Sequence, residues 1–133
     1  MPTTDYAIKT TTDLEPADAE AWVRTALSAE GFGVITEIDM AKTLRDKLGV
    51  ERAPYRILGA CRPQLANDLL RVEPDAGLLL PCNVAIYVED GSTVVAAIDP
   101  EAMIDPSGDS RLTPLVLDAK ERLVRVFASL GGG

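Results

Sequence analysis

Apolar residues alternate with polar ones in some stretches of the chain and recur every three or four residues in others. Alternation is typical of a strand with one buried face, and the longer spacing is typical of a helix. The alternating stretches predict strands at Tyr6–Thr10, Phe32–Asp39, Tyr55–Cys61, Leu78–Glu89 and Thr93–Ile98. The helical spacing predicts two main helices, Pro16–Glu30 and Pro114–Leu130, the second with Thr113 as its N-cap, and two short ones, Met40–Leu48 and Pro63–Leu70.

Capping and turn residues mark the ends of these segments. Gly31 and Gly49 each follow a helix and supply the left-handed conformation that ends it, and Asp39 precedes the first short helix as its N-cap. Asp90–Gly91 predicts a tight hairpin, because both central positions of the favoured turn need a positive φ. Since proline cannot donate to a strand ladder, we expect Pro81 at a bulge, at an edge or where pairing begins.

The alternation also assigns side chains to faces of the sheet. In Leu78–Glu89 the predicted core residues are Cys82, Val84, Ile86 and Val88, and the opposite face carries Asn83, Ala85 and Tyr87. In Phe32–Asp39 the predicted core face carries Phe32, Val34 and Ile38, and the other face carries Ile35, Glu37 and Asp39.

The order of the predicted elements indicates the fold class. Strands and helices do not alternate regularly, and the final hairpin must be antiparallel. We therefore expect an α+β fold with a mostly antiparallel sheet and the two main helices on one face. A length of 133 residues is near the commonest domain size, so residues 1–133 are expected to form a single domain.

Composition removes several classes of function. The chain has no histidine, which excludes Ser-His-Asp and Cys-His mechanisms and a His-ligated zinc. Its formal charge of −8 argues against nucleic acid as a partner, because an acidic protein is repelled by the phosphate backbone. Neither a spanning segment, nor a polybasic patch, nor a signal peptide is evident, so we expect no membrane partner and a cytoplasmic location with reduced thiols.

The remaining candidate chemistry gathers around two cysteines. Cys61 ends a strand just before a helix N-terminus, where free N–H groups and the neighbouring Arg62 favour a thiolate. If the strands that hold Cys61 and Cys82 are antiparallel neighbours, the two thiols are expected to approach each other. Together with Asn83 and Arg56 they form a candidate thiol or ligand site. The alternative is that both thiols are buried apolar side chains and that Arg56 forms a surface salt bridge.

Two weaker signals are better explained structurally. Glu37, Asp39 and Asp99 allow an acidic site, but most acids of so acidic a chain are solvated surface groups. The glycines match no phosphate-binding spacing, and two cysteines twenty-one positions apart give little support for a metal site. The sequence predicts no metal site and does not identify a cofactor.

Four segments carry a resemblance to a known family. They are GFGVITEID (Gly31–Asp39), PYRILGACRP (Pro54–Pro63), GLLLPCNV (Gly77–Val84) and AAIDP (Ala96–Pro100). In order and spacing the chain resembles the bacterial and archaeal "domain of unknown function 302" family, with Arg62 standing where the family pattern has Asn. The resemblance implies a TATA-box-binding-protein-like fold of order β-α-β(4)-α with short inserted helices and a homodimer. It implies no established activity.

Two hypotheses of function follow. The first is a non-enzymatic, homodimeric module that binds a small ligand or another protein, in which Ile35, Ala85 and Tyr87 are interface residues because they lie off the core face. The second is a thiol-dependent protein that handles sulfur, redox equivalents or a soft metal through Cys61 and Cys82. A hydrolase that uses carboxylates alone has the least support, since no acid–base pair or nucleophile motif is present.

Overall fold

A computed structural model describes residues 6–103 and 110–130 of the chain. Its strands are β1 (Ala7–Thr12), β2 (Gly33–Asp39), β3 (Tyr55–Cys61), β4 (Cys82–Glu89) and β5 (Ser92–Ile98). The α-helices are α1 (Pro16–Ala29), α2 (Met40–Leu48), α3 (Pro63–Val72) and α5 (Thr113–Leu130). Short 3₁₀ helices are η1 (Pro74–Leu79), η2 (Pro100–Met103) and η3 (Ser110–Leu112).

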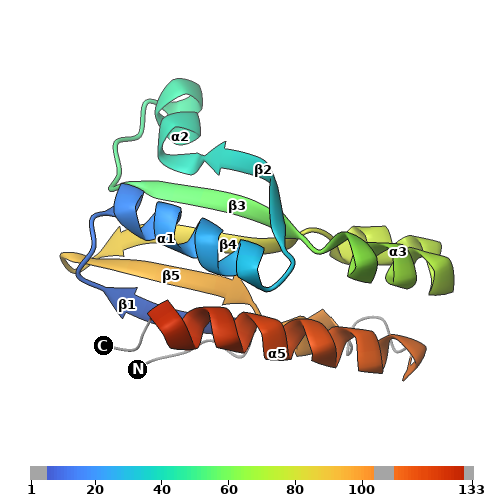
Figure 1. Cartoon of the computed structure of the whole chain (residues 1–133). Coiled ribbons are helices and arrows are strands. Elements are labelled where there is room, and N and C mark those ends of the chain that lie inside the picture. Colours follow the sequence, from blue (N-terminus) through green and yellow to red (C-terminus); the bar gives the residue numbers. More distant parts are fainter. Residues whose placement is uncertain (1–5, 104–109, 131–133) are drawn as a thin grey trace.

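The strands form one sheet in the order β1-β5-β4-β3-β2, and every described pair of neighbours is antiparallel. Helices α1 and α5 lie across one face of this sheet (Figure 1). The α+β class and the placement of the two main helices are therefore confirmed. The alternation predicted in β4 is seen in its burial: Cys82, Val84 and Ile86 are buried and their neighbours are not, whereas Val88, also predicted in the core, is only partly buried.

The main core lies between the sheet and the two long helices. It is made of apolar side chains from α1, α5 and alternate positions of the strands: Ala19, Val23, Leu27, Phe32, Leu58, Ala60, Val84, Ile86, Val95, Ala97, Leu123, Val126 and Phe127. Burial of each large side chain of this kind contributes about 1.5–3 kcal/mol before the entropy cost of ordering it. A second cluster joins α3 and η1 to η3 and α5: Leu65, Leu69, Ala76, Leu112, Val116 and Ala119.

The predicted caps and turns are present. The carboxylate of Asp39 accepts a hydrogen bond from the backbone N–H of Lys42 at 2.9 Å and so caps α2. Gly31 and Gly49 adopt φ values of +86° and +70°, as the helix stops require. Pro81 stands just before β4, whose pairing with β3 begins at Cys82, so the ladder is not interrupted.

Two sequence predictions about the strands are wrong. The register of β2 shifts between Val34 and Thr36, and this bulge reverses the faces that follow it. Ile38, predicted in the core, is 43% exposed, whereas Glu37 turns toward α1. The predicted strand Leu78–Glu89 is also too long, because Leu78 and Leu79 belong to η1 and pairing starts only after Pro81.

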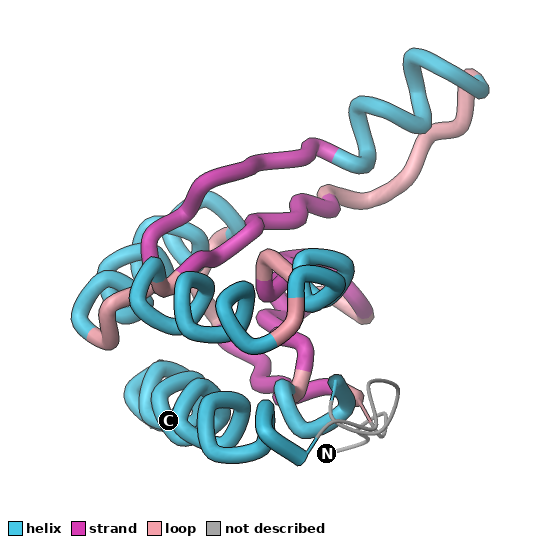
Figure 2. The backbone as a smooth tube through the Cα atoms, turned by 90° about the vertical axis from the view of Figure 1, so that its right-hand side faces the viewer, coloured by secondary structure: helices cyan, strands magenta, loops and turns pink. Residues whose placement is uncertain are grey.

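Strands β2 and β3 carry α2 away from the rest of the molecule. In Figure 2 the two strands run side by side to α2, which lies at the opposite end of the molecule from α5. We call residues 33–61 the arm. No residue of α2 is buried. Among the described helices, none has the length and apolar character needed to cross a lipid bilayer.

Candidate functional site

The face of the sheet opposite α1 and α5, here called the open face, has a row of side chains that crosses four strands. The register places Lys9 of β1 beside Ala96 of β5, Ala96 beside Ala85 of β4, and Ala85 beside Ile57 of β3. Antiparallel partners point to the same side of a sheet, so these four side chains share the open face. The two alanines at the middle of the row leave a hollow there, because larger side chains stand around them.

Aromatic side chains form one wall of this hollow. Tyr55 and Tyr87 are cross-strand partners, and their rings stack at a centroid distance of 5.0 Å with 10° between their planes. The guanidinium of Arg52 lies over the outer face of the stack, 4.9 Å from the centroid of the Tyr55 ring. The pair is therefore held in place from both strands and from the loop that precedes β3.

The opposite wall comes from the segment before β4. Leu78, Leu79, Leu80 and Pro81 line it, and the Leu80–Pro81 peptide bond is cis. Pro81 sits against Gly59, where a Cβ atom would lie 2.8 Å from its ring and would overlap the hydroxyl oxygen of Thr36. Glycine is required there because the wall packs directly on the backbone of β3.

Together these walls border an open cavity of about 610 Å³ on the surface of the sheet. Its lining is mostly apolar, with Asn83 and the tyrosines as neutral polar groups, and Lys9 is the only charged side chain among the described residues that line it. A volume of this size and a lining of this kind are typical of small-molecule sites.

The two predicted site cysteines do not come together. Cys82 is the ladder partner of Ala60, so its side chain shares the core face with Ala60, and the adjacent Cys61 points to the other face. Both thiols are free. Burial raises the pKa of Cys82 to about 11, which keeps this thiol protonated at neutral pH. The expectation that the thiols approach each other is thus wrong. Their strands are neighbours, but Cys82 is paired with Ala60, one residue before Cys61.

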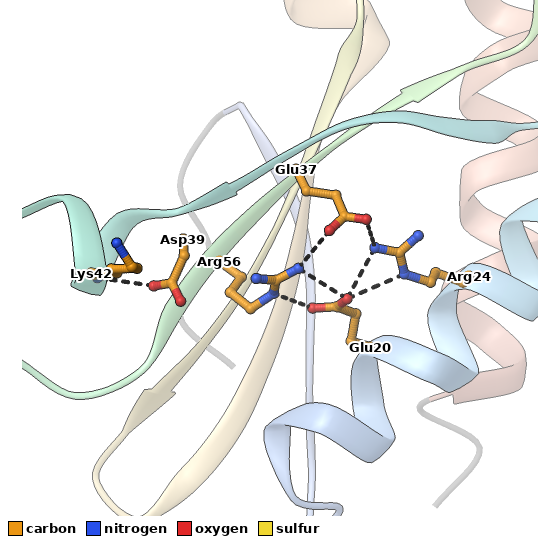
Figure 3. A network of polar contacts seen from close by, with 6 residues as sticks. All are labelled: Glu20, Arg24, Glu37, Asp39, Lys42 and Arg56. Carbon is orange, nitrogen blue, oxygen red and sulfur yellow. Dashed lines mark hydrogen bonds and ion pairs between the residues drawn. The ribbon is translucent and has the colours of Figure 1, made fainter.

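Arg56 lies on the core side of β3, in a network of four charged side chains (Figure 3). Its Nε donates to Glu20 at 2.5 Å and its Nη2 donates to Glu37 at 3.1 Å, while Arg24 donates to the same two carboxylates at 3.0 and 2.7 Å. The hydrogen bond from Arg24 lowers the pKa of Glu37, and the hydrogen bond to Glu20 raises the pKa of Arg56. The network joins α1 to both strands of the arm.

The other polar candidates also have structural partners. Arg62 packs along Gly31 and reaches Asp118 of α5 at 3.6 Å. Asp99 pairs with Lys120 at 3.1 Å and accepts from the backbone N–H of Glu101. Within the described ranges, no group of three or more Cys, Asp or Glu side chains is placed to hold a metal ion.

Of the five site residues predicted from the sequence, Asn83 alone lines the cavity. The alternation in β4 did assign Asn83, Ala85 and Tyr87 to one face, and this face is the one on which the cavity lies. Lys9 and Ile57 were missed as site residues. The sequence did contain a signal, because each of these residues alternates with core residues in its own strand. They form a site only because the register of four strands brings them together.

The comparisons with known proteins concern family and fold. The family model "Domain of unknown function DUF302" matches residues 8–130. The crystal structure of an uncharacterized conserved DUF302 protein from Bacillus stearothermophilus superimposes with a TM-score of 0.86 at 25% identity, over 92% of this chain and 96% of that one. No curated protein sequence matches significantly. Since the family model covers nearly the whole chain and the fold agrees over the same length, this chain belongs to the DUF302 family.

Proposed function

We propose that this protein is a non-enzymatic module that binds a small, largely apolar molecule in the cavity of the open face. The observation that carries the proposal is the cavity itself, with its alanine floor and its stacked tyrosine wall. A hollow lined by apolar side chains favours a ligand that replaces water there, and flat rings gain further contact on the tyrosines. The described residues that line the cavity bring together no nucleophile with an acid–base partner, so binding is a better account of it than catalysis.

A neutral fluorescent dye tests this proposal. N-phenylnaphthylamine is flat and apolar, and we expect it to bind the folded protein with one-to-one stoichiometry in a fluorescence titration. Ala85→Trp fills the centre of the cavity and is expected to abolish binding. Leu117→Trp adds the same side chain at an exposed position of α5, outside the cavity, and is the matched control. Binding that survives Ala85→Trp in a folded variant, or no binding by the wild type, contradicts the proposal.

We also propose that the module is a homodimer in which the arm contacts a second copy of this chain. Large apolar side chains are exposed on the arm: Ile35 by 62%, Ile38 by 43%, Leu48 by 70% and Val50 by 44%. Such a concentration is unusual on the surface of a monomer. Ile35 thus keeps the interface role expected from the sequence, whereas we assign Ala85 and Tyr87 to the cavity.

Charge favours a second copy as the occupant of this surface. Residues 40–56 contain five basic and two acidic side chains, although the whole chain carries a charge of −8. The end of the arm is therefore positive and the rest of the molecule is strongly negative. The arm of one copy is attracted to the body of another, and a two-fold axis repeats the contact.

Light scattering after size-exclusion chromatography tests the dimer. We expect twice the chain mass of 14.2 kDa at micromolar concentration. The double variant Leu48→Glu, Val50→Glu is expected to be a folded monomer. The control Val124→Glu, at an exposed position of α5, is expected to stay dimeric. A monomeric wild type overturns the proposal. The cytoplasmic location expected from the sequence remains a prediction.

A further inference from the structure

Lys9 occupies an unusual place for a cation. It lies in the middle of β1, half-buried, and its ladder partner is Ala96 on the cavity floor. The side chains around it on the open face are apolar or neutral. A charged group that is partly withdrawn from water is costly unless an opposite charge or a strong hydrogen-bond acceptor compensates it.

The described residues do not provide that compensation. Several basic side chains on the surface are paired, as in Arg56 with Glu20, Lys120 with Asp99 and Arg125 with Glu30. Lys47 and Arg71 make no ion pair with the described residues, but both are exposed to water, whereas Lys9 is half-buried. Over residues 6–103 and 110–130, Lys9 makes no hydrogen bond or ion pair, and no Asp or Glu lines the cavity. In a chain with 21 acidic and 13 basic residues, a cation kept among apolar neighbours is a charge available to a ligand.

We infer that the ligand is a free amphiphilic anion, with a flat apolar body and one carboxylate, sulfonate or phosphate group. This inference rests on the proposed function of the cavity. The apolar body lies over Ala85 and Ala96 and against the ring of Tyr87, and the acidic group accepts a charge-assisted hydrogen bond from Nζ of Lys9. The low polarity of the surrounding walls strengthens that bond relative to one in water.

Two dyes that differ only in an acidic group test the inference. Anilinonaphthalenesulfonate is N-phenylnaphthylamine with a sulfonate added, so the ratio of their dissociation constants reports on the anion. We expect the wild type to bind the sulfonate more tightly than the neutral dye. Lys9→Met replaces the lysine with an uncharged side chain of similar length. It is expected to weaken sulfonate binding about tenfold, which corresponds to the loss of one charge-assisted hydrogen bond. It is expected to have little effect on binding of the neutral dye.

The control is Arg71→Met, which removes one positive charge from the exposed surface of α3, outside both the cavity and the arm. It is expected to leave both affinities within a factor of two of the wild type. If Lys9→Met weakens sulfonate binding no more than Arg71→Met does, the anion inference is wrong while the cavity remains a binding site. If neither dye binds the wild type, or if Ala85→Trp leaves both affinities unchanged, the proposed function itself fails.

Discussion

The two faces of the sheet are built from alternate residues of the same strands, but they differ in how they are filled. On the face covered by α1 and α5, Leu58, Val84 and Val95 are completely buried. Their neighbours Ile57, Ala85 and Ala96 are only partly covered and surround a cavity of about 610 Å³. One face therefore contributes the close packing that stabilises the fold, and the other retains apolar surface that a ligand can still bury.

Charges differ between the faces in the same way. Arg56, on the covered side of β3, is held by two carboxylates that come from α1 and β2. Lys9, on the open face, has no such partner in the described part of the chain. Among the described residues, the covered face pairs the charge of Arg56, whereas the open face leaves Lys9 without an ion-pair partner.

Truncation of neighbouring residues on β3 gives the largest expected effect. Leu58→Ala removes a fully buried side chain between the sheet and the helices and is expected to lower the free energy of unfolding by about 3 kcal/mol. Ile57→Ala removes a partly covered side chain from the cavity floor and is expected to cost about 1 kcal/mol. Urea unfolding of both variants measures the difference. Equal losses would show that the open face is packed as closely as the covered one.

The thiol of Cys82 gives a smaller effect that depends on pH. Burial raises its folded-state pKa from 9.0 to about 11, so the folded state holds the proton more tightly than the unfolded state. Its contribution to stability is complete below about pH 9 and is lost as the pH rises through 11, by about 2 kcal/mol. Cys82→Val lacks this titration, and its stability should fall less than that of the wild type between pH 9 and 11.

A third protein, Cys61→Val, extends this pH experiment to a thiol on the open face of the sheet. Cys61 points to the opposite side of the sheet and is only partly buried. We expect its replacement to leave the alkaline loss of stability in place, as measured by urea midpoints at each pH. Parallel curves for the wild type and Cys82→Val up to pH 11 would show that the core around Cys82 does not exclude the thiolate.

Much of the fold follows from short-range patterns in the sequence. Alternation, helix caps at Asp39 and Gly49, and the Asp90–Gly91 turn are local, and Asp90 and Gly91 indeed have φ values of +53° and +77°. The bulge in β2 could not be predicted in this way. Val34 and Ile35 are both apolar, so the sequence does not show which of them becomes the extra residue.

The candidate site depended on contacts between distant segments. The cavity requires Lys9, Ala96, Ala85 and Ile57 to lie in one row, and that row exists only after four strands pair in register. The failure of the two-thiol hypothesis has the same origin, since a difference of one residue in register decides whether two side chains share a face. The sequence predicted that Arg56 forms a salt bridge with acidic side chains, but it did not identify Glu20 and Glu37 as those partners.

The smallest expected effect comes from two arginines on opposite sides of β3. Arg56→Met breaks the network that ties the arm to α1 and is expected to cost about 1 kcal/mol at neutral pH, because the network is only partly shielded from solvent. Arg52→Met removes a cation from the exposed side of the Tyr55 ring and should cost less than about 0.5 kcal/mol. Urea unfolding at low and high salt separates the two, since only the loss at Arg56 involves several ion pairs.

Measurements at low pH are the decisive control for the difference in stability loss between Arg56→Met and Arg52→Met. Arg24 and Arg56 lower the pKa of Glu37, so the network stabilises the fold above the ordinary carboxyl pKa of about 4.5 and loses this contribution as the pH falls through the lower, folded value. The stability gap between the wild type and Arg56→Met should therefore narrow in acid, whereas the gap for Arg52→Met should stay constant because no carboxylate is involved. A gap at Arg56 that is unchanged at low pH would mean that its aliphatic stem, packed beside α1, contributes more than its charge.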